Sequence, residues 1–277
     1  APQHWLARPP GRARPVYDLP GGEVVYFDGS DAFYIDYRER VRVRCEPARG
    51  HVSVSILEPA LEEPWLLSHL IFTLPFLELL KRRGRYSLHA AGVAVGGRAL
   101  LLAGASGSGK STLTLALIKA GFDLMGDDML FLCDSGRNGL RLQAFPDEID
   151  VTDTTVRFFP ELHQLLQRPL ARGWPKRQLP ADALDGVTTV LECRPAMLVF
   201  PSVANAKRSV LEPITEAEAL LELAPNILLT EARSSQAHFD ALAELVSTSS
   251  LYRLATGRDF AAVATLLKEL LTSSAPT

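Results

Sequence analysis

The run Gly104-Ala105-Ser106-Gly107-Ser108-Gly109-Lys110-Ser111, continued by Thr112, decides the fold. It stands between an apolar, β-prone run at 98–103 and a run with helical spacing at 112–119. Small residues let consecutive backbone N–H groups converge on an anion at the start of a helix. A chance glycine-rich turn is the alternative, but the complete strand–loop–helix pattern argues against it. The sequence therefore predicts a nucleoside triphosphate held by residues 104–112, with Lys110 on its β and γ phosphates and Ser111 helping to hold Mg²⁺.

The surrounding pattern predicts an α/β domain over residues 85–277. Runs at 88–95 and 98–103 are joined by Gly96-Gly97, which is typical of a two-residue hairpin turn. Residues 16–84 predict a small β-rich domain that ends in a helix at 65–83, and residues 1–15, rich in Pro and Arg, predict a poorly ordered arm. Further strands are expected at 23–27, 32–37, 41–45, 52–56, 123–132, 140–144, 197–200 and 250–254, and helices at 161–166, 216–223, 237–245 and 259–271.

Composition excludes several classes of protein. The 277 residues, 47% of them hydrophobic, are enough for one large core or a main core with a smaller domain. A net charge of −3 without a basic stripe excludes nucleic acid and anionic membrane as expected partners. Cys45, Cys133 and Cys193 lack disulfide or zinc spacing, and no signal peptide or bilayer-length apolar run is present, so a reducing cytoplasm is expected.

Asp127 and Asp128 form the second chemical element. Asp127 lies 17 residues after Lys110, enough for one helix, one turn and half a strand. Such a unit returns the chain beside the strand at 98–103 and brings at least one carboxylate to the phosphate end. Neighbouring strand residues point to opposite faces, so both acids reach one ligand only if the strand ends or bends there. In that case one holds Mg²⁺ and the other accepts a proton from an attacking hydroxyl; otherwise one acid is solvated or caps a turn.

His89 is the third element. If Val95 pairs with Arg98 across the turn, His89 lies opposite Gly104, where the glycine loop begins. This register places an imidazole near the transferred phosphate, although a single histidine near a strand end is more often structural and a one-residue slip reverses its face. Lys176 and Arg177 are weaker candidates, either on a loop that covers the phosphates or in a solvated basic turn.

In order and spacing, the stretches 88–95, 104–112 and 124–128 resemble the HPr kinase/phosphorylase family and its HPr-kinase-related relatives. The resemblance covers about residues 86–271 and is most specific before residue 134. It implies a P-loop core related to phosphoenolpyruvate carboxykinases and ATP-dependent phosphorylation of a serine hydroxyl on a protein. It further implies Lys110 and Ser111 at the phosphates and Mg²⁺, Asp127 as the base, Asp128 as a metal ligand and His89 beside the phosphoryl group.

Two features depart from the family pattern. The long glycine-bearing signature of bifunctional HPr kinases has no counterpart, and the N-terminal β region differs from the usual N-terminal domain, so neither the phosphorylase reaction nor HPr as acceptor is implied. Similar shortened relatives modify precursor peptides of lasso-type natural products. We therefore expect an ATP- and Mg²⁺-dependent kinase for a serine in a peptide or small protein. A regulatory ATPase without an acceptor, a kinase for free serine or a sugar, and a homo-oligomer all remain open.

Overall fold

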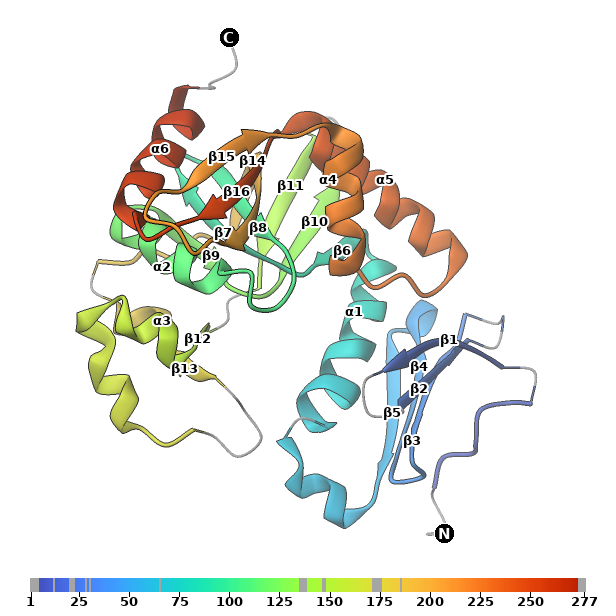
Figure 1. Cartoon of the computed structure of the whole chain (residues 1–277). Helices are drawn as coiled ribbons and strands as arrows, with labels where there is room; N and C mark the ends of the chain where they lie inside the picture. The colour runs from blue at the N-terminus through green and yellow to red at the C-terminus, as the bar shows by residue number, and fades with distance from the viewer. Residues whose placement is uncertain are drawn as a thin grey trace. The chain divides into compact units, whose positions relative to one another are not determined.

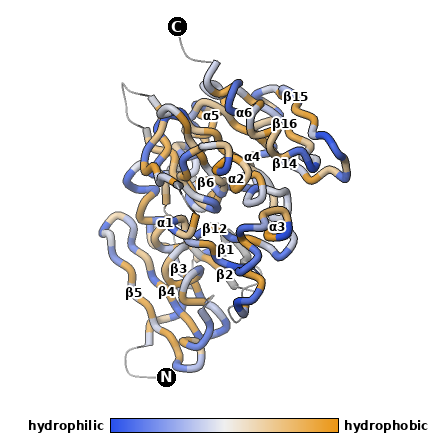
Figure 2. The backbone as a smooth tube through the Cα atoms, turned by 90° about the vertical axis from the view of Figure 1, so that its left-hand side faces the viewer, coloured by the Kyte–Doolittle hydropathy of each residue, from blue (hydrophilic) through white to orange (hydrophobic). Residues whose placement is uncertain are grey.

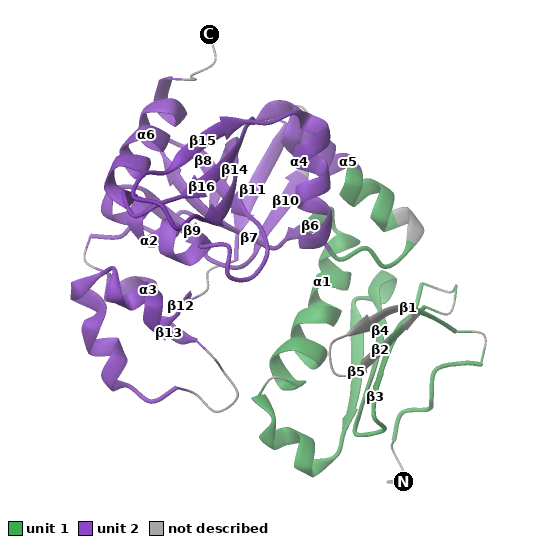
Figure 3. Cartoon of the chain, in the orientation of Figure 1, with its two compact units in different colours: residues 1–86, 228–239 green, residues 87–227, 240–277 purple. Residues whose placement is uncertain are grey.

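The computed structural model describes residues 5–11, 13–19, 23–27, 29, 31–64, 66–134, 139–145, 148–170, 176–184 and 186–273. The chain forms two compact units (Figure 3). Unit 1 comprises Ala1–Tyr86 and Leu228–Phe239, and unit 2 comprises Ser87–Ile227 and Asp240–Thr277. The segment Leu228–Phe239 therefore belongs to the smaller unit, whereas the sequence pattern places it in the larger domain.

Unit 1 contains an antiparallel sheet, which has five strands in the described part of the chain, in the order β1-β2-β3-β4-β5 (Figure 1). Hydrophobic and hydrophilic residues alternate along strands such as β4, as Figure 2 shows. This alternation buries one face of the sheet against apolar side chains that include Leu66 and Leu70. The strands are β1 (Arg14–Leu19), β2 (Glu23–Phe27), β3 (Phe33–Tyr37), β4 (Val41–Glu46) and β5 (His51–Ile56).

Four of these strands confirm the sequence prediction, and β1 was not predicted. Arg14 and Pro15, placed in the arm by their composition, are the first residues of β1. Residues 1–4 and 12 of the predicted arm lie outside the described residues. The helix predicted at 65–83 is a π-helical segment, Leu66–Thr73, that continues directly into α1 (Leu74–Lys81). Pro75, which has no backbone N–H group to donate, stands where the π-helical segment changes to α1.

A buried ion pair joins two distant parts of unit 1. The Lys81 ammonium donates to Glu78 Oε1 at 2.8 Å, to Leu228 O at 2.7 Å and to Thr230 Oγ1 at 3.0 Å. Thr230 donates its hydroxyl to the same Glu78 oxygen at 2.8 Å. The side chains of Lys81 and Glu78 are only 2% and 0% exposed, and burial lowers the pKa of Lys81 despite the neighbouring carboxylate. These bonds explain why the segment after residue 227 belongs with α1.

The larger sheet is mixed, with nine strands in the described residues (Figure 1). Its main order is β6-β10-β11-β14-β8-β7-β9, and β16 pairs with β14 and β15. β14 is parallel to β8 and to β16, whereas β7 is antiparallel to both β8 and β9. The strands are β6 (Arg85–Leu88), β7 (Ala90–Val95), β8 (Arg98–Ala103), β9 (Asp123–Gly126), β10 (Leu130–Asp134), β11 (Leu140–Ala144), β14 (Glu192–Val203), β15 (Val210–Pro213) and β16 (Ser250–Thr256).

Two helices cover one face of this sheet. α2 (Lys110–Lys119) contributes Leu113 and Leu117, and α6 (Phe260–Ser273) contributes Leu267 and Leu271, to a core shared with β7, β8, β14 and β16. The opposite stripe of α2 packs in a second core with β12 (Ile149–Val151), α3 (Asp153–Arg157) and the 3₁₀ segment Pro160–Gln167. The remaining elements are β13 (Arg177–Leu179), α4 (Glu216–Leu223) and α5 (Ala232–Thr248).

The predicted hairpin is confirmed, including its register. Val95 pairs with Arg98 and Ala90 with Ala103, and both turn glycines have positive φ, 59° at Gly96 and 76° at Gly97. The strands predicted at 140–144, 197–200 and 250–254 are also present, within β11, β14 and β16. The predicted helices are also present. The one at 161–166 lies within the 3₁₀ segment, the one at 216–223 is α4, and the one at 237–245 lies within α5. The one at 259–271 lies almost entirely within α6.

The single strand predicted at 123–132 is wrong. The chain forms β9, bends at Asp127 and Asp128, and starts again as β10 at Leu130. β9 pairs with β7, so it does not lie directly beside β8 as the spacing suggested. Across the described residues, no helix is long and apolar enough to cross a bilayer.

Replacing Lys81 by Met is expected to destabilise the protein strongly, because Glu78 would remain buried without its cation. The expected loss is about 3–5 kcal/mol in the free energy of unfolding, measured by urea titration with circular dichroism. The double variant Glu78→Leu/Lys81→Met should recover more than half of this loss. Lys119→Met is the matched control, because Lys119 pairs with Glu161 but is 55% exposed. A Lys81→Met variant no less stable than this control would contradict the assigned role of the ion pair.

Candidate active site

The glycine loop connects the end of β8 to the start of α2. Gly107 and Gly109 have φ values of 83° and 97°, which residues with a side chain rarely adopt. Gly109 is also the N-cap of α2, so no side chain caps the first N–H groups of the helix. These groups and the positive end of the helix dipole are therefore available to an anion.

Lys110 folds back over this loop. Its Nζ donates to Gly104 O at 2.6 Å and to Ala105 O at 3.2 Å, and the residue is 8% exposed. Burial lowers the pKa of Lys110, while the charges of Asp128 and Asp127 oppose the change. The ammonium group thus rests on two carbonyl oxygens at the start of the loop, where a phosphate oxygen would compete for it.

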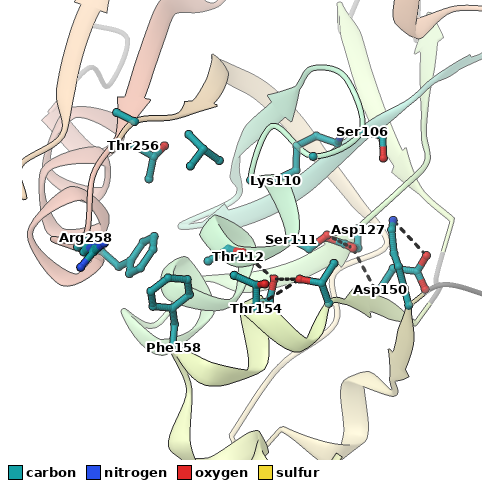
Figure 4. A pocket seen from close by; sticks show the side chains of 18 of the residues that line it. Ser106, Lys110, Ser111, Thr112, Asp127, Asp150, Thr154, Phe158, Thr256 and Arg258 are labelled. Atoms are coloured by element: carbon teal, nitrogen blue, oxygen red, sulfur yellow. Dashed lines mark hydrogen bonds and ion pairs between the residues drawn. The ribbon is translucent and has the colours of Figure 1, made fainter. Parts of the chain in front are cut away.

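Asp127 lies beside Ser111, with which it interacts (Figure 4). Its Oδ2 accepts the Ser111 hydroxyl at 2.8 Å and the backbone N–H of Asp150 at 3.1 Å. The residue is 3% exposed, and its Oδ1 is buried without a hydrogen-bond partner among the described residues. Burial raises the pKa of Asp127 to about 6, although both hydrogen bonds act in the opposite direction.

Asp128 has a different environment. Its Oδ1 lies 3.2 Å from Nδ1 of His89, and the two side chains are 48% and 39% exposed. Burial raises the pKa of Asp128, but the hydrogen bond and charge of His89, together with Lys176 and Lys110, outweigh it and hold this pKa below its usual value. The backbone N–H of His89 donates to the carbonyl oxygen of Asn226 at 2.9 Å, which fixes the chain just before β7.

The strand geometry brings these groups together. His89 directly precedes β7 and Gly104 directly follows β8, so the confirmed hairpin register puts them at the same sheet edge. β9 ends at Gly126 on the other side of β7, and the bend that follows lets Asp127 and Asp128 line one pocket. The bend that two functional carboxylates require is therefore present.

The pocket has a volume of about 570 Å³, within the range of small-molecule sites. Asp127 and Asp150 lie toward one end, Phe158 and Arg258 toward the other, and Ser111 and Thr112 between them (Figure 4). Thr112 Oγ1 lies 2.9 Å from Thr155 Oγ1 beside the pocket. The lining residues are His89, Ser106, Gly107, Gly109, Lys110, Ser111, Thr112, Asp127, Asp128, Asp150, Thr152, Thr154, Thr155, Phe158, Lys176, Val203, Ala204, Asn205, Thr256, Gly257, Arg258 and Phe260.

The structure separates the two basic candidates. Lys176 lines the pocket with its Nζ 3.4 Å from Asp150 Oδ2. Arg177 instead donates to Asp153 Oδ1 at 2.7 Å and to backbone carbonyl oxygens, including that of Leu165 at 2.9 Å. Their neighbours Trp174 and Pro175 lie outside the described residues. Arg177 therefore holds local structure, and only Lys176 belongs to the pocket.

Sequence reasoning missed the pocket residues that come from β12, from α3 and the residue after it, from β14, and from the end of β16 with the turn before α6. Asp150, Phe158 and Thr256 belong to segments distant from the glycine loop, and no spacing rule connects them to it. Within the described part of the chain, no group of three or more His, Cys, Asp or Glu side chains forms a ready metal site.

Comparison with known proteins gives a distant likeness among solved structures. No family model matches the chain, and no curated protein matches it. Among solved structures, the chain is similar to the HPr(Ser) kinase/phosphatase from Coxiella burnetii, at 15% sequence identity and a TM-score of 0.34. The match covers 68% of this chain and 97% of that chain. At this distance the roles of individual residues rest on the site itself.

Proposed function

We propose that this chain is a kinase that transfers the γ-phosphoryl group of ATP to a serine hydroxyl of a peptide or small protein. One observation carries the proposal. At the sheet edge where the glycine loop leads into α2, two pairs of side chains line the same pocket. They are Ser111 with the buried Asp127, and His89 with the accessible Asp128. Phosphoryl transfer needs both a cation-binding group and a proton acceptor beside a phosphate cradle.

The glycine loop and Lys110 are the proposed triphosphate site. Uncapped N–H groups at the start of α2 supply donors to the phosphate oxygens, and the dipole of α2 favours their negative charge. Lys110 is already inside the loop, so it only has to exchange the carbonyl oxygens of Gly104 and Ala105 for phosphate oxygens. These groups would stabilise charge that develops on the transferred phosphoryl group.

Ser111 and Asp127 fit a magnesium ion. Mg²⁺ prefers oxygen ligands and is commonly held by one or two carboxylates together with substrate phosphates. Asp127 Oδ1 is buried without a partner in the described chain, and burial raises the pKa of this carboxyl. When bound, Mg²⁺ would neutralise phosphate charge. The Ser111 hydroxyl, which now donates to Asp127, could turn its oxygen toward the ion.

Asp128 is the proposed base. As the serine oxygen attacks the γ phosphorus, the bond between this phosphorus and the ADP oxygen breaks, and the hydroxyl proton moves to the Asp128 carboxylate. Asp128 is accessible from the pocket and its pKa is lowered, so it is ionised at neutral pH, and His89 orients it. The sequence-based assignment gave the base to Asp127 and the metal to Asp128. Burial of Asp127 beside Ser111 favours the exchange of these roles, because a base must first reach the proton.

Incubation with Mg²⁺, γ-labelled ATP and a degenerate peptide library with a fixed central serine is expected to yield labelled peptides. Matched libraries with alanine or threonine at that position serve as controls, and the alanine library should remain unlabelled. Lys110→Ala should abolish labelling, because the ammonium that holds the phosphates is lost. Release of free phosphate without any labelled peptide would favour an ATPase and contradict the proposed acceptor.

The two carboxylates should separate kinetically. Asp128→Asn is expected to lower the rate of transfer about 10²–10⁴-fold at saturating Mg²⁺ while ATP affinity changes little, because a proton acceptor is lost. Asp127→Asn should instead raise the Mg²⁺ concentration for half-maximal transfer by about ten-fold or more. Asp123→Asn, outside the pocket, is the control. The reverse pattern, with Asp127→Asn inactive at saturating Mg²⁺, would restore the base to Asp127.

Asp127 should also make the stability of the nucleotide-free protein depend on pH. Its folded pKa of about 6 exceeds the ordinary value of 3.8, so its contribution to stability is intact below pH 3.8 and is lost as pH rises through 6. Asp127→Asn should therefore gain stability over the wild type between pH 4 and pH 7.5, by up to about 3 kcal/mol at about 1.4 kcal/mol per pH unit. Urea unfolding without Mg²⁺ measures this change.

The neighbouring acid supplies a control of opposite sign. The pKa of Asp128 is lowered in the folded protein, so its carboxylate stabilises the fold above its unfolded pKa, and this stability is lost as the pH falls through the folded pKa. Asp128→Asn should therefore lower the free energy of unfolding at neutral pH and change it little in acid. If the free energies of unfolding of the Asp127→Asn variant and the wild type differ by the same amount at every pH, the stated environment of Asp127 is wrong.

A further inference from the structure

The end of the pocket remote from the acids takes no part in the transfer described above. It is lined by Phe158, which directly follows α3, by Thr256 at the end of β16, and by Arg258 and Phe260 around the start of α6. In Figure 4, Phe158 and Arg258 are separated from Asp127 and Asp150 by Ser111 and Thr112 of α2. A ligand whose phosphates lie at α2 can therefore extend in either of two directions.

Phe158 presents an aromatic surface at this end. The residue is 45% exposed and lines the pocket. Its ring meets the ring of Phe260 edge to face, with centroids 5.2 Å apart and an interplanar angle of 66°. Phe260 is partly buried and packs against the core beneath α2 and α3. The anchored ring therefore braces the exposed one and leaves it available for stacking.

Thr256 adds a hydroxyl group that could bond to a ligand. The residue is 6% exposed, lines the pocket, and its Oγ1 has no hydrogen-bond partner among the described residues. A buried hydroxyl without a partner costs free energy that a ligand atom could recover. A ligand at this end would therefore be expected to combine an aromatic face with a polar atom.

The turn that connects Thr256 of β16 to Phe260 of α6 is held by hydrogen bonds. Gly257 N donates to Ser209 Oγ at 2.8 Å, and Ser209 donates to Asp259 Oδ1 through its N at 2.9 Å and its Oγ at 2.5 Å. A Cβ on Gly257 would lie 2.7 Å from the carbonyl carbon of Arg208, so the two backbones are in close contact. A wall held this firmly loses little conformational entropy when a ligand binds.

We propose that Phe158 is the stacking platform for the nucleobase of the bound triphosphate and that the Thr256 hydroxyl contacts the nucleoside. This inference rests on the proposed function. The γ-phosphoryl group must reach Asp128 at the acidic end, so the nucleoside leaves the glycine loop toward the aromatic end. Stacking on an aromatic face suits any purine, because every base has a π face. Phe260 is a positioning residue that acts through Phe158.

Isothermal titration with two ligands tests this site. Mg·ATP carries a base, and Mg·tripolyphosphate carries the same phosphates without one. Phe158→Ala should weaken ATP binding about ten-fold or more and leave tripolyphosphate binding within two-fold of the wild type. Phe158→Trp should retain ATP affinity. Phe239→Ala is the matched control, because Phe239 is 46% exposed but lies outside the pocket, in unit 1.

The failures of the two proposals are distinguishable. If the wild type binds ATP and Phe158→Ala binds it equally well, the stacking site is wrong and the kinase proposal stands. Equal weakening of ATP and tripolyphosphate would also overturn it, because the substitution would then act on the phosphate site or on folding. If the wild type binds neither ligand, the proposed function fails and the inference fails with it.

Discussion

The hydrogen bond from the Ser111 hydroxyl to the Asp127 carboxylate joins the first turn of α2 to the bend after β9. Its geometry depends on the place of β7 between β8 and β9. Because β7 is antiparallel to both neighbours, its first residue lies at the sheet edge where they end. His89, the glycine loop and the acidic pair therefore meet at one edge. Most of the chemistry of the candidate site follows from three adjacent strand ends.

Two neighbouring carboxyl groups acquire different properties from that edge. Asp127 is enclosed beside α2, which raises its pKa, whereas Asp128 faces the pocket beside an imidazole, which holds its pKa low. Opposite shifts in adjacent acids are a common basis for dividing roles within one site. Here the division also follows access, since the enclosed group meets the Ser111 hydroxyl and the open one can meet an incoming hydroxyl. A single bend in the chain thus creates two chemical environments.

Local rules allowed part of this site to be predicted from the sequence. The Gly96-Gly97 turn favours the register that the structure confirms, so the position of His89 opposite the glycine loop followed by counting. The bend at Asp127 could not be predicted, because the apolar residues on both sides read as one continuous strand. The pairing of β9 with β7 and the aromatic end of the pocket depend on tertiary contacts. Phe158 and Thr256 carry no local pattern that relates them to the loop.

Unit 1 is built from two segments that lie far apart in the sequence, and this affects how the protein folds during synthesis. Lys81 and its acceptor at Leu228 are 147 positions apart, and most of unit 2 is encoded between them. During translation the N-terminal sheet leaves the ribosome first, yet Glu78 and Lys81 then lack the groups that complete their bonding. The smaller unit can acquire its final interior only after the strands of the glycine-loop sheet as far as β15 have emerged. An excised fragment ending at residue 86 would remain in that incomplete state.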